Sequence, residues 1–150
     1  MDDPRSTYFT FFNEIGIISQ LSRAILESHL PHGMLVSHFS VLNHLIRVED
    51  GRTPQDISRA FQVPKTSMTH TLSVLEKHNL VDMKPNPKDG RSKTVWITGK
   101  GREFRDQAIN AMDQDISHLS GLLSDIDIAA LAEQLATIRK IMDMSRDEVR

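Results

Sequence analysis

The chain of 150 residues contains no cysteine, which excludes disulfide bonds and thiolate chemistry. Aromatic residues are also few, with one Trp and one Tyr. No apolar run approaches the roughly 18 residues that a membrane span needs. No basic segment followed by an apolar one opens the chain as a signal peptide would. We therefore expect a cytoplasmic protein that does not contact a membrane.

Sequence signatures of enzymes are missing as well. There is no Gly-rich phosphate loop, no H-E-x-x-H metal motif and no G-x-S-x-G nucleophile turn. The Asp and Glu residues show no pairing on one predicted element of the kind that acid–base catalysis uses. We predict no enzymatic activity and no cofactor.

Charge is distributed unevenly along the chain, although the formal net charge is only −2. Residues 52–105 hold eleven Lys and Arg against five Asp and Glu, a net charge of +6. The remaining residues carry a net charge of −8. A basic middle segment between acidic ends is typical of a nucleic-acid-binding surface. An unevenly charged but functionless solvated surface is the alternative.

Two short helices a tight turn apart are predicted in this basic segment. The first opens at Thr53-Pro54, since Thr suits an N-cap and Pro the first helical position. The second spans about 64–78, and Asn79 suits the left-handed residue that often ends a helix. Its apolar face consists of Met68, Leu72 and Leu75.

A hairpin is predicted next, with strands over 80–84 and 93–98. The loop between them, 85–90, is rich in Pro, Gly and charge. The order of elements is that of a helix-turn-helix followed by a wing. The wing carries the motif D-x-R-x-K-x-V-x-x-T-x-x-G, formed by Asp89, Arg91, Lys93, Val95, Thr98 and Gly101.

With this motif the chain resembles the MarR family of bacterial winged-helix transcription regulators, over nearly all of its 150 residues. The resemblance implies a single domain over 1–150 that is mainly α with a small β wing. Its winged helix-turn-helix would cover 34–101, flanked by N- and C-terminal dimerisation helices over 5–30 and 102–147. The implied function is a homodimeric repressor of pseudo-palindromic operators in double-stranded DNA, relieved by a small-molecule effector.

The helices outside the helix-turn-helix pair are predicted from apolar residues at helical spacing. They cover 8–28, 34–48, a stretch from Gly99–Arg102 to about Ser120, and 125–145, the last capped by Ser124 or Asp125. The predicted dimer interface consists of Phe9, Phe12, Ile128, Leu131, Leu135, Ile138 and Met142. Its last five residues step by three and four, as in a coiled-coil seam. Ordinary intramolecular core is the alternative.

The polar face of the helix over 64–78 is predicted to enter the major groove of DNA. Candidate DNA-contacting residues are Thr53, Lys65, Thr66, Ser67, Thr69, His70, Ser73, Lys77, Lys88, Asp89, Arg91 and Lys93. We expect Thr66, Ser67 and His70 to contact bases, and Thr69, Ser73 and Lys77 to contact phosphates. Arg91 would enter the minor groove, and Asp89 would hold Arg91 or the loop by a hydrogen bond. Where many family members have Arg and Gly, this chain has His70 and Asn79.

The resemblance also implies an effector pocket between the dimer helices and the winged unit, often for phenolic or other amphipathic anions. Its candidate residues are Ile18, Ser22, His38, Phe39, Leu42, Arg47 and Met112, of which the apolar ones serve equally well as core. The histidines at 29, 32, 38 and 44 invite a metal hypothesis, but a zinc site needs three or four convergent ligands. Surface or capping positions are favoured for them.

Two alternatives to the leading function remain open. One is a winged-helix protein–protein interaction module without DNA function, and the other is a regulator that senses metal through histidine. Salt-sensitive DNA binding distinguishes the leading function from the interaction module.

Overall fold

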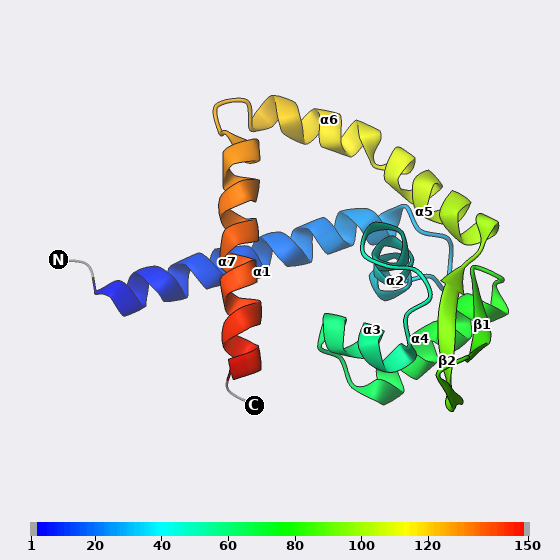
Figure 1. Cartoon of the computed structure of the whole chain (residues 1–150). Coiled ribbons are helices and arrows are strands. Elements are labelled where there is room, and N and C mark those ends of the chain that lie inside the picture. The colour runs from blue at the N-terminus through cyan, green and yellow to red at the C-terminus, as the bar shows by residue number, and fades with distance from the viewer. Residues whose placement is uncertain (1–2, 149–150) are drawn as a thin grey trace. The chain divides into compact units, whose positions relative to one another are not determined.

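The computed structural model describes residues 3–148 (Figure 1). These residues form seven helices and two strands in the order α1–α4, β1, β2 and α5–α7. The chain forms two compact units that divide between Met112 and Asp113. Across the described residues, no helix is long and apolar enough to cross a membrane. The mainly helical fold with one small β wing agrees with the prediction from sequence.

Helix α1 spans Pro4–Ser28 and begins earlier than the predicted residue 8. The Asp3 carboxylate accepts a hydrogen bond from the backbone N–H of Arg5 at 3.1 Å. An acidic N-cap followed by proline favours the start of a helix. Most side chains of α1 are exposed, and Leu26, near its C-terminal end, is buried.

Helix α2 spans Val36–Arg47 and is close to its predicted bounds. The backbone N–H of Leu35 donates to His38 Nδ1 at 2.8 Å, so an imidazole satisfies a backbone group at the start of this helix. His38 is only 4% exposed. The predicted capping position is therefore confirmed for His38, whereas a surface position is wrong.

The helix-turn-helix consists of α3 (Pro54–Phe61) and α4 (Lys65–Lys77). Thr53 caps α3 as predicted, because its hydroxyl oxygen accepts from the backbone N–H of Asp56 at 3.2 Å. The predicted inward face of α4 is confirmed, since Met68, Leu72 and Leu75 are all buried. Burying a side chain of this size contributes about 1.5–3 kcal/mol.

A left-handed residue ends each of these two helices. Asn79 has a φ of 58°, as predicted, and Gln62 has a φ of 52°. Asn tolerates this conformation better than most residues, whereas Gln gives no such signal in a sequence. Gln62 turns the chain from α3 into α4, and Asn79 turns it from α4 into the wing.

The wing consists of β1 (Val81–Asn86) and β2 (Asp89–Ile97), which pair antiparallel. The register places Val81 opposite Ile97 and Asn86 opposite Asp89. The predicted loop over 85–90 is therefore too long, because the strands continue into it and leave a tight turn.

Short polar side chains explain how the strands reach the tip. Asn86 Oδ1 accepts from the backbone N–H of Lys88 at 3.0 Å, and Asn86 Nδ2 donates to Ser92 Oγ at 2.9 Å. Asp89 Oδ1 accepts from the backbone N–H of Arg91 at 3.0 Å. Side chains that bond the nearby backbone in this way stabilise turns.

The wing leads into α5 (Gly99–Ala111) through a crowded junction. Thr98 Oγ1 accepts from the backbone N–H of Gly101 at 2.9 Å and donates to the carbonyl of Asn79 at 2.7 Å. A Cβ atom at Gly101 would collide with the backbone carbonyl of Leu80. The T-x-x-G part of the wing motif thus combines a helix cap with a close backbone approach.

The helix predicted from about 99 to 120 is interrupted. Helix α5 ends at Ala111, and α6 spans Asp113–Leu122. Asp113 and Asp115 lie in the first turn of α6. Carboxylates are favourable at the positive end of a helix, so they stabilise a new start here.

Helix α7 spans Ile128–Glu148, which begins later than the predicted residue 125. Asp127 Oδ1 accepts from the backbone N–H of Ala130 at 3.0 Å. Asp127 is therefore the capping residue in place of the predicted Ser124 or Asp125.

We expect Gly101→Ala to lower the free energy of unfolding by about 1–3 kcal/mol, because the added methyl group meets backbone that cannot rotate away. Urea unfolding followed by circular dichroism measures this. Gly121→Ala in α6 is the matched control, since a Cβ there meets nothing within 4 Å. That variant should gain about 0.5–1 kcal/mol. Equal effects of the two variants would contradict the crowded junction.

Candidate nucleic-acid interface

Helix α4 presents one continuous polar face because its apolar residues are buried. The exposed residues of this face are Lys65, Thr66, Ser67, Thr69, His70, Ser73 and Lys77. All seven are among the DNA contacts predicted from sequence. Small side chains at the N-terminal end of a recognition helix allow its backbone to approach base edges closely.

One hydroxyl on this face is already engaged. Thr69 Oγ1 donates to the carbonyl of Lys65 at 2.9 Å. A phosphate accepts hydrogen bonds, so the predicted phosphate contact of Thr69 requires this internal bond to break. Thr53 is half-buried as the cap of α3, where its hydroxyl oxygen accepts a hydrogen bond and its O–H is still able to donate.

The four candidate residues of the wing, Lys88, Asp89, Arg91 and Lys93, are all exposed. The Asp89 carboxylate accepts from the backbone N–H of Arg91, which holds the loop, one of the two arrangements predicted for it. Arg91 is therefore an exposed residue beside a turn that its own backbone N–H stabilises.

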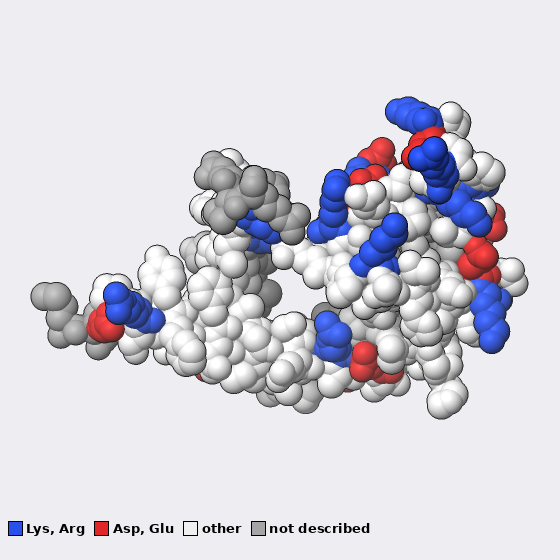
Figure 2. Space-filling view, turned by 90° about the horizontal axis from the view of Figure 1, so that it is seen from below, with Lys and Arg blue, Asp and Glu red and all other residues white. Residues whose placement is uncertain are grey.

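Basic side chains gather over the winged part of the first unit. Figure 2 shows Lys and Arg concentrated there, whereas the N-terminal half of α1, on the left, is mostly neutral. The figure agrees with the net charge of +6 over residues 52–105. Such a surface attracts the phosphate backbone without regard to base sequence.

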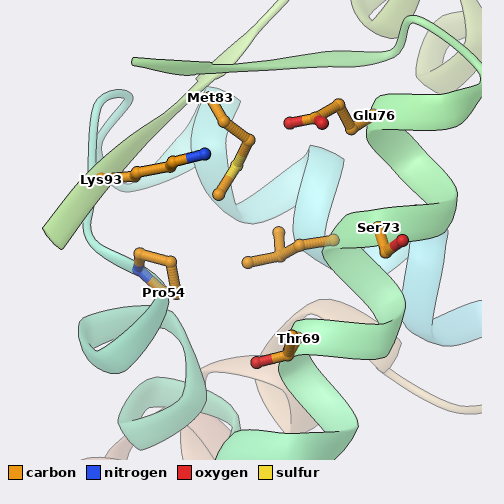
Figure 3. Close-up of a pocket in the computed structure, with 7 residues that line it drawn as sticks. Pro54, Thr69, Ser73, Glu76, Met83 and Lys93 are labelled. Carbon is orange, nitrogen blue, oxygen red and sulfur yellow. The ribbon is translucent and has the colours of Figure 1, made fainter. Parts of the chain in front are cut away.

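A cleft of about 200 Å³ separates α4 from the wing (Figure 3). It is lined by Pro54, Thr69, Leu72, Ser73, Glu76, Met83 and Lys93. Glu76 extends into it from α4 and Lys93 from β2. The sequence analysis missed Glu76, although it is the one acidic residue in the α4 sequence. A carboxylate here opposes phosphate and offsets part of the attraction of Lys93.

A second cavity, of about 630 Å³, lies between α1, α2 and α4. Its lining includes Arg23 from α1, Ser40 from α2 and Phe61 from α3. Thr66, Ser67 and His70 of α4 line it as well. The three residues predicted to contact bases thus also border this cavity.

The seven predicted effector residues do not line either of these cavities. His38 and Leu42 are buried, whereas Ile18 and Arg47 are exposed. Ser22 is exposed and donates its hydroxyl to the Ser19 carbonyl, and Phe39 and Met112 are half-buried. Helical periodicity identified an inward face but did not distinguish core from cavity wall.

Two histidines of α2 have a pKa lower than the ordinary value for histidine. Burial lowers the pKa of His38 from 6.5, and the nearby His70 and His78 lower it further. Burial also lowers the pKa of His44, with a further contribution from Arg52. Among the described residues, no group of three or more His, Asp or Glu is placed to hold a metal ion.

Known proteins are similar to this chain in sequence over part of its length. A family model described as the MarR family matches residues 32–92. The HTH-type transcriptional regulator BilQ of Clostridioides difficile (strain CD3) is 28% identical over 93 residues. That match covers 62% of this chain and 63% of BilQ, which is less than two thirds of the relative's length.

Solved structures share the fold over most of the chain. The regulator BldR of Sulfolobus solfataricus gives a TM-score of 0.74 at 22% identity, covering 95% of this chain and 99% of BldR. A mutant MarR of E. coli, complexed with operator DNA, gives 0.71 at 21% identity, covering 93% and 99%. PcaV of Streptomyces coelicolor, in complex with its natural ligand, gives 0.66 at 17% identity, covering 87% and 90%.

The exposed face of α4, the helix-turn-helix and the basic wing together define a winged-helix protein. Residues 32–92 match the MarR family of transcriptional regulators in sequence, and most of the chain shares the fold of solved structures of such regulators.

The lowered pKa of His44 predicts a pH effect on stability. The folded chain binds a proton at His44 less readily than the unfolded chain does. The free energy of unfolding is therefore highest above about pH 6.5 and decreases as the pH falls below that value. His44 Nε2 is buried without a hydrogen-bond partner, and the ring lies 5.3 Å from that of Phe61 between centroids. We expect His44→Leu to melt at the same temperature as the wild type or higher at pH 7.5. On transfer to pH 5.5, its melting temperature should fall by less than that of the wild type. His32→Leu, at an exposed position, is the control, and its melting temperature should fall by as much as that of the wild type. The same loss in His44→Leu as in wild type would exclude His44 as the titrating group.

Proposed function

We propose that this protein is a homodimeric transcriptional repressor that acts in the cytoplasm by binding DNA and not by catalysis. A small-molecule effector, such as a phenolic or other amphipathic anion, would relieve repression. The observation that carries the DNA-binding part is the exposed polar face of α4 beside an exposed basic wing. We further propose that residues 1–150 act as one domain in which 34–101 read DNA.

DNA reading would use α4 and the wing together. The buried apolar row of α4 leaves its polar face free to enter the major groove, where base edges carry distinct donors and acceptors. Arg91 at the wing tip would reach the adjacent minor groove, whose negative potential attracts a guanidinium. The solved complex of E. coli MarR with operator DNA, which has this fold, supports the proposal.

The exposed apolar faces of two helices support a dimer. Phe9 of α1 is 76% exposed, and Leu131 and Leu135 of α7 are 45% and 42% exposed. Exposed apolar residues on each of these helices are unfavourable in water, and a second copy of the chain would cover them. A twofold dimer also matches an operator whose two half-sites lie about 10–10.5 base pairs apart.

The cavity between α1, α2 and α4 supports the effector part of the proposal. Arg23 supplies a cation suited to an anion, and Phe61 supplies apolar surface. Thr66, Ser67 and His70 border the same space, so an occupant would compete for or displace the residues that face DNA. A coupling free energy of about 1–3 kcal/mol between the two sites gives 5- to 150-fold relief.

The proposed function is tested by selecting binding sites for the purified protein from genomic fragments and then titrating salt. A recovered inverted repeat with an affinity that falls steeply between about 50 and 200 mM salt would support it. Absence of any enriched site would remove the DNA-binding proposal and favour the protein–protein interaction module.

Arg91→Ala should weaken binding to the recovered operator by about 1–3 kcal/mol, because the wing loses its minor-groove contact. Fluorescence anisotropy with labelled DNA measures the change. Lys140→Ala, an exposed cation of α7, is the control with the same change in net charge. Operator affinity that stays at the wild-type value in Arg91→Ala would remove this residue from the interface.

Leu135→Glu should convert the dimer to a monomer, because a carboxylate in a covered apolar face loses its hydration. The side chain is already 42% exposed in the single chain, so we expect the variant to fold. Light scattering after size exclusion measures the mass. Gln134→Glu adds the same charge at the neighbouring exposed position and should remain dimeric. A dimeric Leu135→Glu protein would place the interface elsewhere.

A further inference from the structure

The turn between α2 and α3 carries an aspartate that contacts three separate parts of the winged unit. Asp50 Oδ1 accepts from the backbone N–H of its neighbour Gly51 at 3.1 Å. The same oxygen accepts from the backbone N–H of Ile97 at 2.9 Å, across 47 positions of sequence. Asp50 Oδ2 lies 3.7 Å from Nη2 of Arg102, in the first turn of α5.

This carboxylate completes the edge of the wing sheet. Next to it, the backbone N–H of Gly51 donates to the Val95 carbonyl at 2.9 Å, and that of Val95 donates to the Arg52 carbonyl at 2.8 Å. Residues 51 and 52 thus act as a short third strand beside β2. At Ile97 the backbone N–H donates to the Asp50 side chain and not to a backbone carbonyl.

A carboxylate suits the position better than an amide would. Its oxygen accepts two N–H groups, and hydrogen bonds to a charged acceptor are stronger than those to a neutral one. The second oxygen faces the cation of Arg102, whereas an amide would present a donor there. The Asp50 side chain is 26% exposed, so solvent screens this ion pair only in part.

The contact lies at the base of the wing and not at its DNA-facing tip. Ile97 is the last residue of β2, and the exposed cations Arg91 and Lys93 lie further along the same strand. Because the strand is continuous, fixing the orientation of its base also fixes the direction of its tip. The third contact leads to α5, which a second bond also ties to α2, since Arg105 Nε donates to Asn43 Oδ1 at 3.1 Å.

We infer that Asp50 is a positioning residue for DNA binding, which fixes the wing on the α2–α3 turn and links it to α5. Asp50 itself does not touch DNA in this arrangement. The inference rests on the proposed function, because the consequence of a misplaced wing is a loss of operator affinity.

The chain contains a reporter for this junction. Trp96 is the single Trp of the sequence and lies beside Ile97 in β2. Its ring packs on Gly51, where an added Cβ would lie 2.5 Å from Trp96 Cζ2. Gly51 has a φ of 74°, which holds the turn in a conformation that few other residues adopt. Trp96 is already 39% exposed, so release of the turn from β2 would increase the contact of the indole with water and shift its emission further to longer wavelength.

The test uses Asp50→Asn in the full-length protein, with Glu49→Gln as the control. Both changes remove one negative charge from the same turn, but Glu49 contacts only the half-buried side chain of Arg52 among the described bonds. We expect Asp50→Asn to weaken binding to the selected operator by roughly 5- to 20-fold. Its Trp96 emission should shift to longer wavelength, and hydrogen–deuterium exchange should rise at the Ile97 amide. Glu49→Gln should stay within about twofold of wild type in affinity and unchanged in both other measurements.

Three outcomes would overturn the inference. One is an unchanged affinity in Asp50→Asn at a temperature where the protein is fully folded, since a merely stabilising residue has no effect there. Another is a weaker affinity without change in Trp96 emission or Ile97 exchange. The third is the same effect in Glu49→Gln.

A second variant separates the link to α5 and protects against misfolding of the first. Arg102→Gln keeps both backbone hydrogen bonds of Asp50 and removes only the ion pair. It should shift the Trp96 emission in the same direction but by less. Absence of any shift would overturn the link to α5. Failure of the wild type to bind any selected DNA would remove the proposed function alone, because emission and exchange still test the anchoring of the wing.

Discussion

Burial of the apolar row of α4 is the interaction on which the arrangement of the proposed DNA-binding surface depends. Met68, Leu72 and Leu75 belong to one cluster with buried residues of α2, α3 and the wing. Because a helix is rigid, fixing this row also fixes the opposite face, which carries the hydroxyls and cations. Rotation of α4 would expose three large apolar side chains at a cost of several kcal/mol. The polar face is therefore oriented by packing on its far side and not by contacts of its own.

The wing follows a similar principle, with a held base and a free tip. At the base, Thr98 bonds the carbonyl of Asn79, Gly101 lies against the backbone of Leu80, and Asp50 accepts from Ile97. The tip is held only by local side-chain bonds within the turn, such as that of Asp89. A tip of this kind projects its cations into solvent, where they remain available to phosphate and groove.

Electrostatics on the two sides of α4 differ in kind. The outer side is basic, and Glu76 in the cleft beside Lys93 offsets part of that charge. On the inner side, burial lowers the pKa of His38 and His44, so these imidazoles take up a proton less readily than exposed ones. Attraction to DNA and stability of the core therefore depend on separate groups, although His38 lies close enough to His70 for their charges to interact.

The sequence by itself determined the winged helix-turn-helix, the inward row of α4, the cap at Thr53 and the left-handed Asn79, since each follows from a local pattern with one physical solution. It also identified the exposed candidates on α4 and in the wing. Only the tertiary structure decided where helix α5 stops, how far the strands extend and what Asp50 and Glu76 face. The buried His38 and the walls of the two cavities belong to this second group. These features depend on contacts between residues distant in sequence. The type of a residue on one helix does not indicate which residue of another helix it contacts.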